Sequence, residues 1–236
     1  MDMLESILAG ISKKKYKMKI FIIGKSSNLA KHLLKKLENR PDIKVCSIST
    51  KKDFNYVDRF EKLKNKIMEF KPNIIFNLSG LTKFNLCEKN VNEAYKINTF
   101  FPQKLSNFCE ENKIFFIYFS SDAVFSGKKN KLYTVNDVPA PESTYGKSKL
   151  LAENLIIQNK FSLIIRLPML YGKYFNSGFV YESLKKINLK KKIYLFKDVY
   201  CSPIDAEDVC NYIFNNLILK KKIQMLLKKK NYSFIE

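Results

Sequence analysis

Short apolar segments alternate along the chain with stretches whose apolar residues recur at helical spacing. The strand-like segments are rich in Ile, Phe, Val and Leu and cover residues 18–23, 43–48, 73–78, 113–119 and 161–166. Helical spacing between them is visible over residues 56–70, 211–219 and around Leu33, Ala94, Ile97 and Leu105. Strands alternating with helices predict a parallel sheet covered on both faces. We therefore expect an α/β fold with a Rossmann-like, doubly wound parallel sheet.

A glycine turn follows the first predicted strand. The turn precedes a helix, so its backbone N–H groups and the positive end of the helix dipole can face a pyrophosphate. Only the first glycine of the pattern Gly-x-x-Gly-x-x-Gly is present, with Ser27 and Ala30 at the other two places. We nevertheless expect the turn to bind a dinucleotide cofactor through Gly24, Ser26, Ser27, Asn28 and Leu29.

Small and polar residues end two further predicted strands. Right-handed crossovers bring the carboxyl ends of parallel strands to one edge of a sheet, where ligands bind. The turn of Leu78, Ser79 and Gly80 is therefore expected to border the cofactor. Ser120, Ser121 and Asp122 follow the fourth strand and would lie beside a substrate, although capping of the strand end is the alternative interpretation of the two serines.

Tyr145 and Lys149 are four residues apart in a predicted helix, so they project from the same face. A neighbouring ammonium favours the phenolate and is expected to lower the pKa of the tyrosine from about 10. The tyrosine could then exchange a proton with a substrate oxygen. The spacing alone is a weak signal in a chain with 13 tyrosines and abundant lysine.

Together these segments resemble the extended short-chain dehydrogenase/reductases, and most closely the dTDP-4-dehydrorhamnose reductase family. The resemblance covers residues 18–208 and includes the glycine turn, residues 71–77, residues 119–127 and the run from Tyr145 to Lys149. It implies that Tyr145 is the general acid and that Lys149 is its partner and a ribose contact. It further implies that Ser121 polarises the substrate carbonyl with Asp122 nearby, and that Asn98 orders a water beside the lysine.

The resemblance implies NAD(P)H-dependent reduction of a nucleotide-linked keto-sugar in surface polysaccharide biosynthesis. The second strand offers no acidic residue for a ribose diol, so NADP(H) is favoured and NAD(H) stays possible. Asp53 and Phe54 correspond to family residues near the adenine. The alternatives are an epimerase or dehydratase of the same fold, and a non-catalytic NADP-binding regulatory subunit.

The chain also departs from the family pattern. Leu81 replaces a common histidine, and the carboxyl-terminal region is about fifty residues shorter, which makes substrate binding the least constrained part of the prediction. We expect an N-terminal extension over residues 1–17, a dinucleotide-binding domain over residues 18–172, and a shortened substrate lobe with a lysine-rich tail over residues 173–236.

Composition excludes several other functions. The formal net charge is +21, but the excess is lysine spread along the whole chain with only three arginines, so a nucleic-acid partner is not expected. The five cysteines form no Cys-x-x-Cys pair, which argues against a metal site or disulfides and favours the cytoplasm. No segment has membrane-spanning length. The single histidine, His32, is expected at the surface, which excludes a catalytic site of the Ser-His-Asp type. A homodimer is possible.

Overall fold

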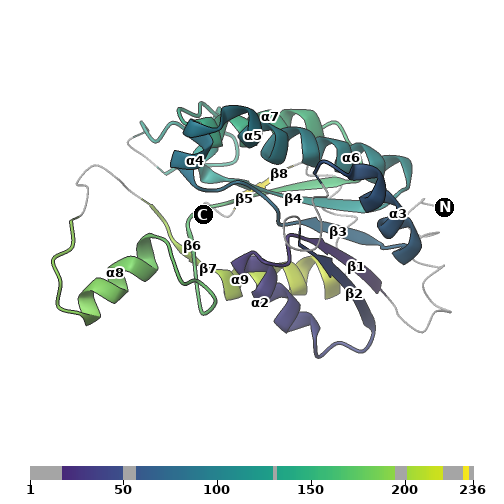
Figure 1. Cartoon of the computed structure of the whole chain (residues 1–236), viewed down its shortest axis with the longest axis horizontal. Helices are drawn as coiled ribbons and strands as arrows, with labels where there is room; N and C mark the ends of the chain where they lie inside the picture. Colours follow the sequence, from purple (N-terminus) through teal and green to yellow (C-terminus); the bar gives the residue numbers. More distant parts are fainter. Residues whose placement is uncertain (1–17, 50–56, 130–131, 195–200, 220–230, 234–236) are drawn as a thin grey trace.

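A parallel sheet in the order β2-β1-β3-β4-β5-β8 forms the centre of the protein (Figure 1). The computed structural model describes residues 18–49, 57–129, 132–194, 201–219 and 231–233. The strands are β1 (Met18–Ile23), β2 (Ile43–Ile48), β3 (Ile74–Asn77), β4 (Phe115–Ser121), β5 (Ser162–Leu167) and β8 (Asn231–Ser233). The strand order reverses between β1 and β3, which is where doubly wound sheets bind ligands. The predicted α/β fold is confirmed.

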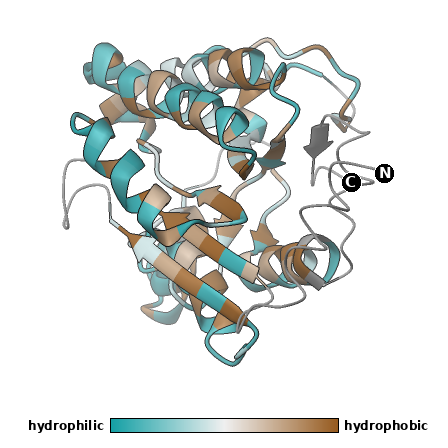
Figure 2. Cartoon of the chain, turned by 90° about the vertical axis from the view of Figure 1, so that its right-hand side faces the viewer, coloured by the Kyte–Doolittle hydropathy of each residue, from teal (hydrophilic) through white to brown (hydrophobic). Residues whose placement is uncertain are grey.

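Helices cover both faces of this sheet. One layer is α2 (Asn28–Leu37) with α9 (Ala206–Tyr212), and the other is α3 (Phe60–Phe70), α6 (Phe101–Glu111) and α7 (Thr144–Ile156). Successive side chains of a strand point to opposite faces. In β1, Ile20 and Ile22 therefore join the core under α2 and α9, whereas Phe21 and Ile23 join the core under the other layer. Figure 2 shows the resulting apolar strands between the helices.

A long helical region leads from the end of β3 to α6. It consists of α4 (Phe84–Lys89), α5 (Val91–Tyr95) and the π-helical turn η1 (Lys96–Phe100), which continues into α6. A π-helical turn rotates the residues that follow and often marks a functional site. Here the turn holds Asn98, which is 1% exposed, so the expected site residue lies inside the fold.

The chain after β5 forms a smaller unit beside the sheet. Strands β6 (Leu170–Tyr171) and β7 (Ile204–Asp205) pair in parallel, and α8 (Phe179–Asn188) projects away without a buried residue (Figure 1). The chain then returns to the main body, because α9 packs against α2 and β8 pairs with β5. A short 3-10 turn, η2 (Asp122–Val124), follows β4, and the π-helix η3 (Ile213–Leu219) follows α9.

Two predicted helix boundaries were wrong. Helix α3 begins at Phe60 rather than near residue 56, and Asp58 before it forms an ion pair with Lys96 of η1. The last helix begins at Ala206 rather than Asn211, because the Asp205 carboxylate caps it by accepting a hydrogen bond from the Glu207 N–H at 2.7 Å. Helix α8 and strand β8 were not predicted.

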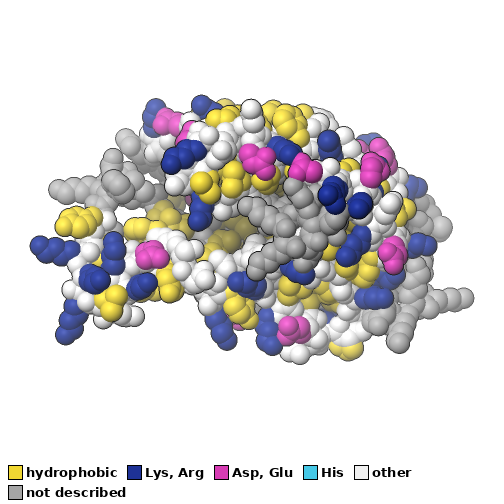
Figure 3. All heavy atoms as spheres, in the orientation of Figure 1, with side chains coloured by type: hydrophobic (Ala, Val, Ile, Leu, Met, Phe, Trp, Pro, Cys, Tyr) yellow, Lys and Arg dark blue, Asp and Glu magenta, His cyan; other side chains and the backbone are white. Residues whose placement is uncertain are grey.

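The positive charge shows no single focus on the face drawn in Figure 3, where lysine and arginine side chains are scattered among neutral and acidic ones. Several lysines of the described residues are paired with carboxylates, for example Lys129 with Asp137 at 2.6 Å and Lys35 with Glu38 at 2.8 Å. Nucleic-acid binding proteins gather their positive charge in a patch or stripe. The scatter on this face agrees with the expectation that the excess of lysine is compositional.

Candidate active site

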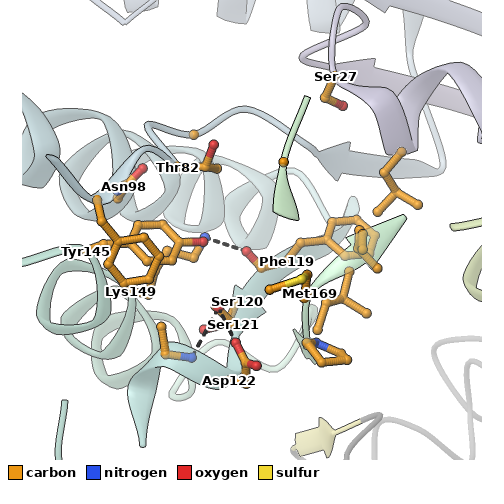
Figure 4. Close-up of a pocket in the computed structure, with 18 of the residues that line it drawn as sticks. Ser27, Thr82, Asn98, Phe119, Ser120, Ser121, Asp122, Tyr145, Lys149 and Met169 are labelled. Atoms are coloured by element: carbon orange, nitrogen blue, oxygen red, sulfur yellow. Dashed lines mark hydrogen bonds between the residues drawn. The ribbon is translucent and has the colours of Figure 1, made fainter. Parts of the chain in front are cut away.

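A cavity of about 1210 Å³ opens at the carboxyl ends of β1, β3, β4 and β5. Its walls come from the turn after β1, the turn after β3, the end of β4, helix α7 and the segment after β5 (Figure 4). The expected site residues that line it are Gly24, Ser26, Ser27, Asn28, Leu29, Leu78, Ser79, Gly80, Asn98, Ser121, Asp122, Tyr145 and Lys149. Asp53 and Phe54 lie outside the described residues. The topology thus brings together segments that are far apart in sequence.

The glycine turn is pressed against the turn after β3. Gly24 has φ +91°, and a Cβ atom there would lie 2.7 Å from the carbonyl carbon of Leu78 and from the Ser79 nitrogen. No L-residue with a side chain fits such a position without displacing the backbone. Gly24 therefore fixes the spacing of two cavity walls, as expected of the first glycine in a dinucleotide turn.

The other two glycine positions have separate explanations. Ser27 is the N-cap of α2, and its Oγ atom accepts a hydrogen bond from the Ala30 N–H at 3.2 Å. Ala30 is fully buried, so its methyl group is accommodated between α2 and the sheet. The neighbouring Ser26 Oγ donates to the Ser49 Oγ at 3.0 Å. The turn therefore keeps its helix-terminal geometry, and the residues present fit a dinucleotide pyrophosphate.

Ser121 and Tyr145 meet at the opposite end of the cavity. Ser121 ends β4, and its Oγ donates to Asp122 Oδ1 at 2.9 Å and accepts from the Ala123 N–H at 3.2 Å. Ser121 also acts on the Tyr145 phenol, because it lowers the pKa of that group. Gly146 permits this approach, because a Cβ atom there would lie 2.1 Å from the Ala123 carbonyl oxygen. Figure 4 shows the serine and the phenol on one side of the cavity.

The expected effect of Lys149 on the Tyr145 phenol is wrong for this structure. Burial raises the pKa of Tyr145 to about 12, and Ser121 is the neighbour that opposes this rise. Lys149 is not among the groups that shift the pKa of Tyr145. Burial lowers the pKa of Lys149 itself to about 7, with Glu153 opposing the shift. The helix spacing predicted the shared face correctly but not the solvation that governs both groups.

The Lys149 side chain is 4% exposed and points toward β4. Its Nζ atom donates a hydrogen bond to the Phe119 carbonyl oxygen at 2.5 Å and lies 4.1 Å from the centre of the Tyr118 ring. Figure 4 shows the hydrogen bond from the ammonium to the Phe119 carbonyl. The lysine is therefore fixed on the cavity wall.

Asn98 connects the loop after β3 with α7. Its Oδ1 atom accepts from the Leu81 N–H at 2.8 Å, and its Nδ2 atom donates to the Leu81 carbonyl at 3.0 Å and to the Ser148 Oγ at 3.1 Å. Its backbone carbonyl accepts from the Tyr118 hydroxyl at 2.9 Å. The alternative that Asn98 is a residue of the helix surface is thereby excluded. Its catalytic role stays a proposal.

Several cavity residues were missed from the sequence. The Phe84 ring lies 5.1 Å from the Tyr145 ring and is 51% exposed, so it forms part of the wall beside the phenol. Met169 follows β5 and lines the same cavity, as the rule on strand ends would have indicated. Two buried polar atoms, Asn77 Nδ2 and Ser120 Oγ, have no hydrogen-bond partner within the described structure.

His32 is not at the surface, and that expectation is wrong. Its side chain is 6% exposed, with the Tyr174 ring centre at 4.5 Å and Phe175 also nearby. The segment after β6 folds back over α2 and covers the imidazole. Burial lowers the pKa of His32, although Asp205 and Glu207 oppose the shift. The imidazole is not among the groups that line the cavity.

The described residues contain no group of three or more His, Cys, Asp and Glu side chains placed to hold a metal ion. Within the same ranges, no helix combines the length and the hydropathy that crossing a bilayer requires.

The chain is similar in sequence to several other proteins, including the following three. The spore coat polysaccharide biosynthesis protein SpsK of Bacillus subtilis (strain 168) is 29% identical over 83% of the chain and 68% of its own length. The dTDP-4-dehydrorhamnose reductase of Aggregatibacter actinomycetemcomitans is 27% identical over 83% of the chain and 66% of its own length. Methionine adenosyltransferase 2 subunit beta of Rattus norvegicus is 32% identical over 48% of the chain and 34% of its own length. The chain thus spans about two thirds of the length of the first two of these relatives.

The fold is shared with solved structures. The dTDP-4-dehydrorhamnose reductase of Bacillus anthracis str. Ames, solved in complex with NADP, superposes with a TM-score of 0.78 at 23% identity. The match covers 93% of this chain and 74% of that one. The family model described as the RmlD substrate binding domain matches residues 18–231. Since this match spans nearly all of the 236 residues, the chain belongs to the RmlD substrate binding domain family.

Proposed function

We propose that the protein reduces the carbonyl group of a nucleotide-linked keto-sugar with NADPH, as a step of polysaccharide biosynthesis. The observation that carries this proposal is the position of Ser121, Tyr145 and Lys149 on one wall of a cavity that begins at the Gly24 turn. The names of the relatives support it, because they include a dTDP-4-dehydrorhamnose reductase and a polysaccharide biosynthesis protein. The B. anthracis structure with NADP supports the choice of cofactor.

The dinucleotide would lie along the carboxyl edge of the sheet. Gly24, Ser26 and the first turn of α2 would hold its pyrophosphate, and Leu78, Ser79 and Gly80 would border it on the side of β3. When bound, the dinucleotide supplies the hydride for the carbonyl carbon. The residues at the other end of the cavity then have to orient the sugar and supply a proton.

Tyr145 would donate that proton to the substrate oxygen. Its raised pKa keeps the phenol protonated at neutral pH, so it is an acid before the reaction rather than a base. The Ser121 hydroxyl lies beside the phenol and would donate a hydrogen bond to the same oxygen, because charge develops there as the carbonyl is reduced. Its present acceptor is the Asp122 carboxylate, whose pKa burial raises.

Lys149 would bind the nicotinamide ribose and restore the acid after each reaction. A buried amine with a pKa near 7 exists as ammonium and as free amine in comparable amounts at neutral pH. It can therefore pass a proton toward the phenolate that the reduction leaves behind. The polar contacts of Asn98 hold the loop and the helix that frame this exchange.

The substrate would bind over Phe84 and the segment after β5. We propose that β6, α8 and β7 form the substrate lobe, since Leu170, Gly178 and Phe179 line the outer part of the cavity. The identity of the sugar and of its nucleotide is not fixed by these contacts. A cytoplasmic location and a homodimer stay predictions from the sequence.

The proposal is tested by incubating the protein with NADPH and dTDP-, GDP-, UDP- or CDP-linked keto-sugars under anaerobic conditions. A reductase consumes one NADPH for each product molecule, which the loss of absorbance and product analysis quantify. An epimerase or dehydratase of the same fold would form product while the bound cofactor ends the cycle in its starting state. Product without net consumption of NADPH would therefore replace the proposed reaction with that alternative.

A second candidate is a non-catalytic NADP-binding regulatory subunit. The similarity to a subunit of methionine adenosyltransferase favours it, although that match covers only 48% of this chain. Measuring both the affinity for NADPH and the turnover of keto-sugars separates the reductase from the regulatory subunit. Tight binding without turnover of any keto-sugar would favour the subunit, whereas failure to bind NADPH would contradict both candidates.

A further inference from the structure

Tyr118 is a buried polar side chain to which the reaction above assigns no role. It lies on β4, is 1% exposed, and points into the core beneath α6 and α7 rather than into the cavity. Its hydroxyl group donates a hydrogen bond to the backbone carbonyl of Asn98 at 2.9 Å. A phenylalanine would fill the same apolar position, so the hydroxyl requires a separate explanation.

The first part of the explanation is the π-helical turn η1. Such a turn alters the regular hydrogen bonds of a helix, so an external donor can satisfy a backbone carbonyl there. The Tyr118 hydroxyl reaches the carbonyl of Asn98 from the sheet. The hydroxyl thereby connects β4, which ends in Ser121, to the turn η1. The Asn98 side chain of that turn is hydrogen-bonded to the backbone of Leu81.

The second part is the contact between the Tyr118 ring and Lys149. The Nζ atom lies 4.1 Å from the ring centre, well within the distance at which an aromatic face attracts a cation. The same Nζ atom donates to the carbonyl of Phe119, the next residue of β4. Strand β4 thus supplies both contacts that fix the ammonium, and the ring stabilises its charged form in a desolvated site.

We infer that Tyr118 is a positioning residue for Lys149: its ring holds the ammonium against β4, and its hydroxyl holds the turn that carries Asn98. The part that concerns turnover rests on the proposed reductase function, whereas the contact between ring and ammonium does not. Tyr118 touches neither the expected cofactor turn nor the carbonyl site, so it acts through the lysine. Through these contacts the Tyr118 side chain of β4 holds η1 and the Lys149 side chain of α7 in place.

Other ionisable groups act on the same site and have to be considered in a pH experiment. Glu153 lies one turn beyond Lys149 on α7 and raises the pKa of Lys149. Asp122 at the end of β4 and Cys87 on α4 act on the Tyr145 phenol. Tyr118 itself interacts with Tyr145 and Glu153, and Glu153 is ion-paired with Arg166. Because Tyr118→Phe removes the hydroxyl and keeps the ring, the difference between Tyr118→Phe and Tyr118→Leu reports on the ring.

The test compares Tyr118→Leu, Tyr118→Phe and the control Phe116→Leu. Phe116 is fully buried on the same strand and in the same core as Tyr118, so its substitution also removes a ring from the core. The free energy of unfolding is measured from pH 5 to pH 9. A lysine with a depressed native pKa makes stability rise with pH above that pKa. His32, whose pKa burial also lowers, adds a rise at lower pH that all variants share, so the difference in onset between variants reports the native pKa of Lys149.

The expected onset is near pH 7 for the parent protein. In Tyr118→Leu it moves down by about one pH unit, since the ring no longer stabilises the ammonium. It stays in place in Tyr118→Phe and in Phe116→Leu. An onset in Tyr118→Leu that matches Phe116→Leu would overturn the role of the ring. This measurement needs no cofactor, so it remains decisive if the proposed reductase function fails.

Turnover and NADPH affinity test the hydroxyl. Tyr118→Phe keeps the ring and loses the bond to the Asn98 carbonyl, and we expect a decrease in turnover of about tenfold with an unchanged onset pH. Parent turnover in this variant would overturn the role of the hydroxyl. If Tyr118→Leu does not fold, the milder Tyr118→Phe still decides that part, and Tyr118→Met replaces the leucine variant in the measurement of the onset pH.

Discussion

The Nδ2 atom of Asn98 donates a hydrogen bond to the Oγ atom of Ser148 at 3.1 Å, which joins two residues 50 positions apart in the sequence. Ser148 is buried on α7 between Tyr145 and Lys149, and its Oγ donates in turn to the Tyr145 carbonyl at 2.7 Å. The bond therefore connects the π-helical turn to the helix that presents both expected catalytic side chains. The adjacent Thr99 Oγ1 adds a bond to the Ser148 carbonyl at 2.6 Å.

The first prediction concerns Asn98. Asn98→Ala removes three hydrogen bonds and leaves the backbone N–H and carbonyl of Leu81 and the Ser148 hydroxyl without this partner. The free energy of unfolding should therefore fall by about 2–4 kcal/mol. Denaturant unfolding measures the change. Ser148→Ala is the control, because it removes only one side of this network and should cost about 1 kcal/mol. Equal stability of Asn98→Ala and the parent protein would contradict the structural role of the amide.

The second prediction concerns the proton donor. Tyr145→Phe removes one hydroxyl group at the end of the cavity while the ring keeps its contact with Phe84. NADPH affinity should change less than about threefold, whereas turnover should fall by a factor of about 100 or more. Fluorescence titration and single-turnover kinetics measure the two effects separately. Parent-like turnover would remove Tyr145 from the proposed chemistry.

The third prediction separates two adjacent serines. Ser121→Ala removes the hydroxyl group that donates to Asp122 and lowers the pKa of Tyr145, and turnover should fall by a factor of about 10–100. Ser120→Ala is a matched control, because the Ser120 Oγ atom has no hydrogen-bond partner within the described structure. Its turnover should remain within a factor of about three of the parent value. The assignment fails if the two variants lose the same activity.

The fourth prediction concerns helix packing. An alanine inside a helix is normally more stable than a glycine by about 1 kcal/mol. At Gly146 the sign should reverse, because the new methyl carbon would lie 2.1 Å from the Ala123 carbonyl oxygen and 2.8 Å from the Pro141 Cβ atom. Gly146→Ala should lower the unfolding free energy by about 2–4 kcal/mol and should also lower turnover.

Gly127→Ala provides the comparison for this packing argument. No atom lies within 4 Å of the added methyl group at Gly127, and the cost there comes from φ +74° alone. That cost should be about 1 kcal/mol. Thermal unfolding of both variants ranks them. A Gly146→Ala protein more stable than Gly127→Ala would show that α7 does not press on the Ala123 segment.

The fifth prediction follows from the pKa of Lys149. The native pKa of about 7 lies below the unfolded value, so the unfolded chain binds more protons above pH 7 and stability should rise with pH from there. Between pH 7 and pH 9 the gain should be on the order of 2 kcal/mol. Lys149→Met should abolish the rise and be more stable at pH 7. A parent-like pH profile in Lys149→Met would assign the rise to another group.

The alternation of apolar segments predicted the central strands because β1, β3, β4 and β5 are mostly buried and lie between helices of ordinary length. It also predicted that Gly24, Ser121 and Tyr145 would line one cavity, since parallel strands place their carboxyl ends at the same edge of a sheet. It could not predict the pKa values of Tyr145 and Lys149, because these depend on how completely the neighbouring elements exclude water. Proximity of an amine to a phenol is visible in helix spacing, whereas desolvation is not.

Other features were hidden for different reasons. His32 is covered by the segment that contains Tyr174, which lies more than a hundred residues away in sequence, and no local pattern reports such a contact. Tyr118 looked like one apolar residue among several in a strand. Its hydroxyl acquires a partner only because η1 is a π-helical turn, which a periodicity of 3.6 residues does not reveal.

The proposed reaction transfers a hydride from NADPH, bound in the cavity, to the carbonyl carbon of a sugar. The most direct test incubates the protein with NADPH deuterated at C4 of the nicotinamide and with dTDP-4-dehydrorhamnose, and analyses the product by mass spectrometry and NMR. We predict one deuterium at C4 of the product sugar for each NADPH consumed, with the rate strongly reduced in Tyr145→Phe. An unlabelled product, or deuterium transfer at the same rate in the parent protein and Tyr145→Phe, would contradict the account.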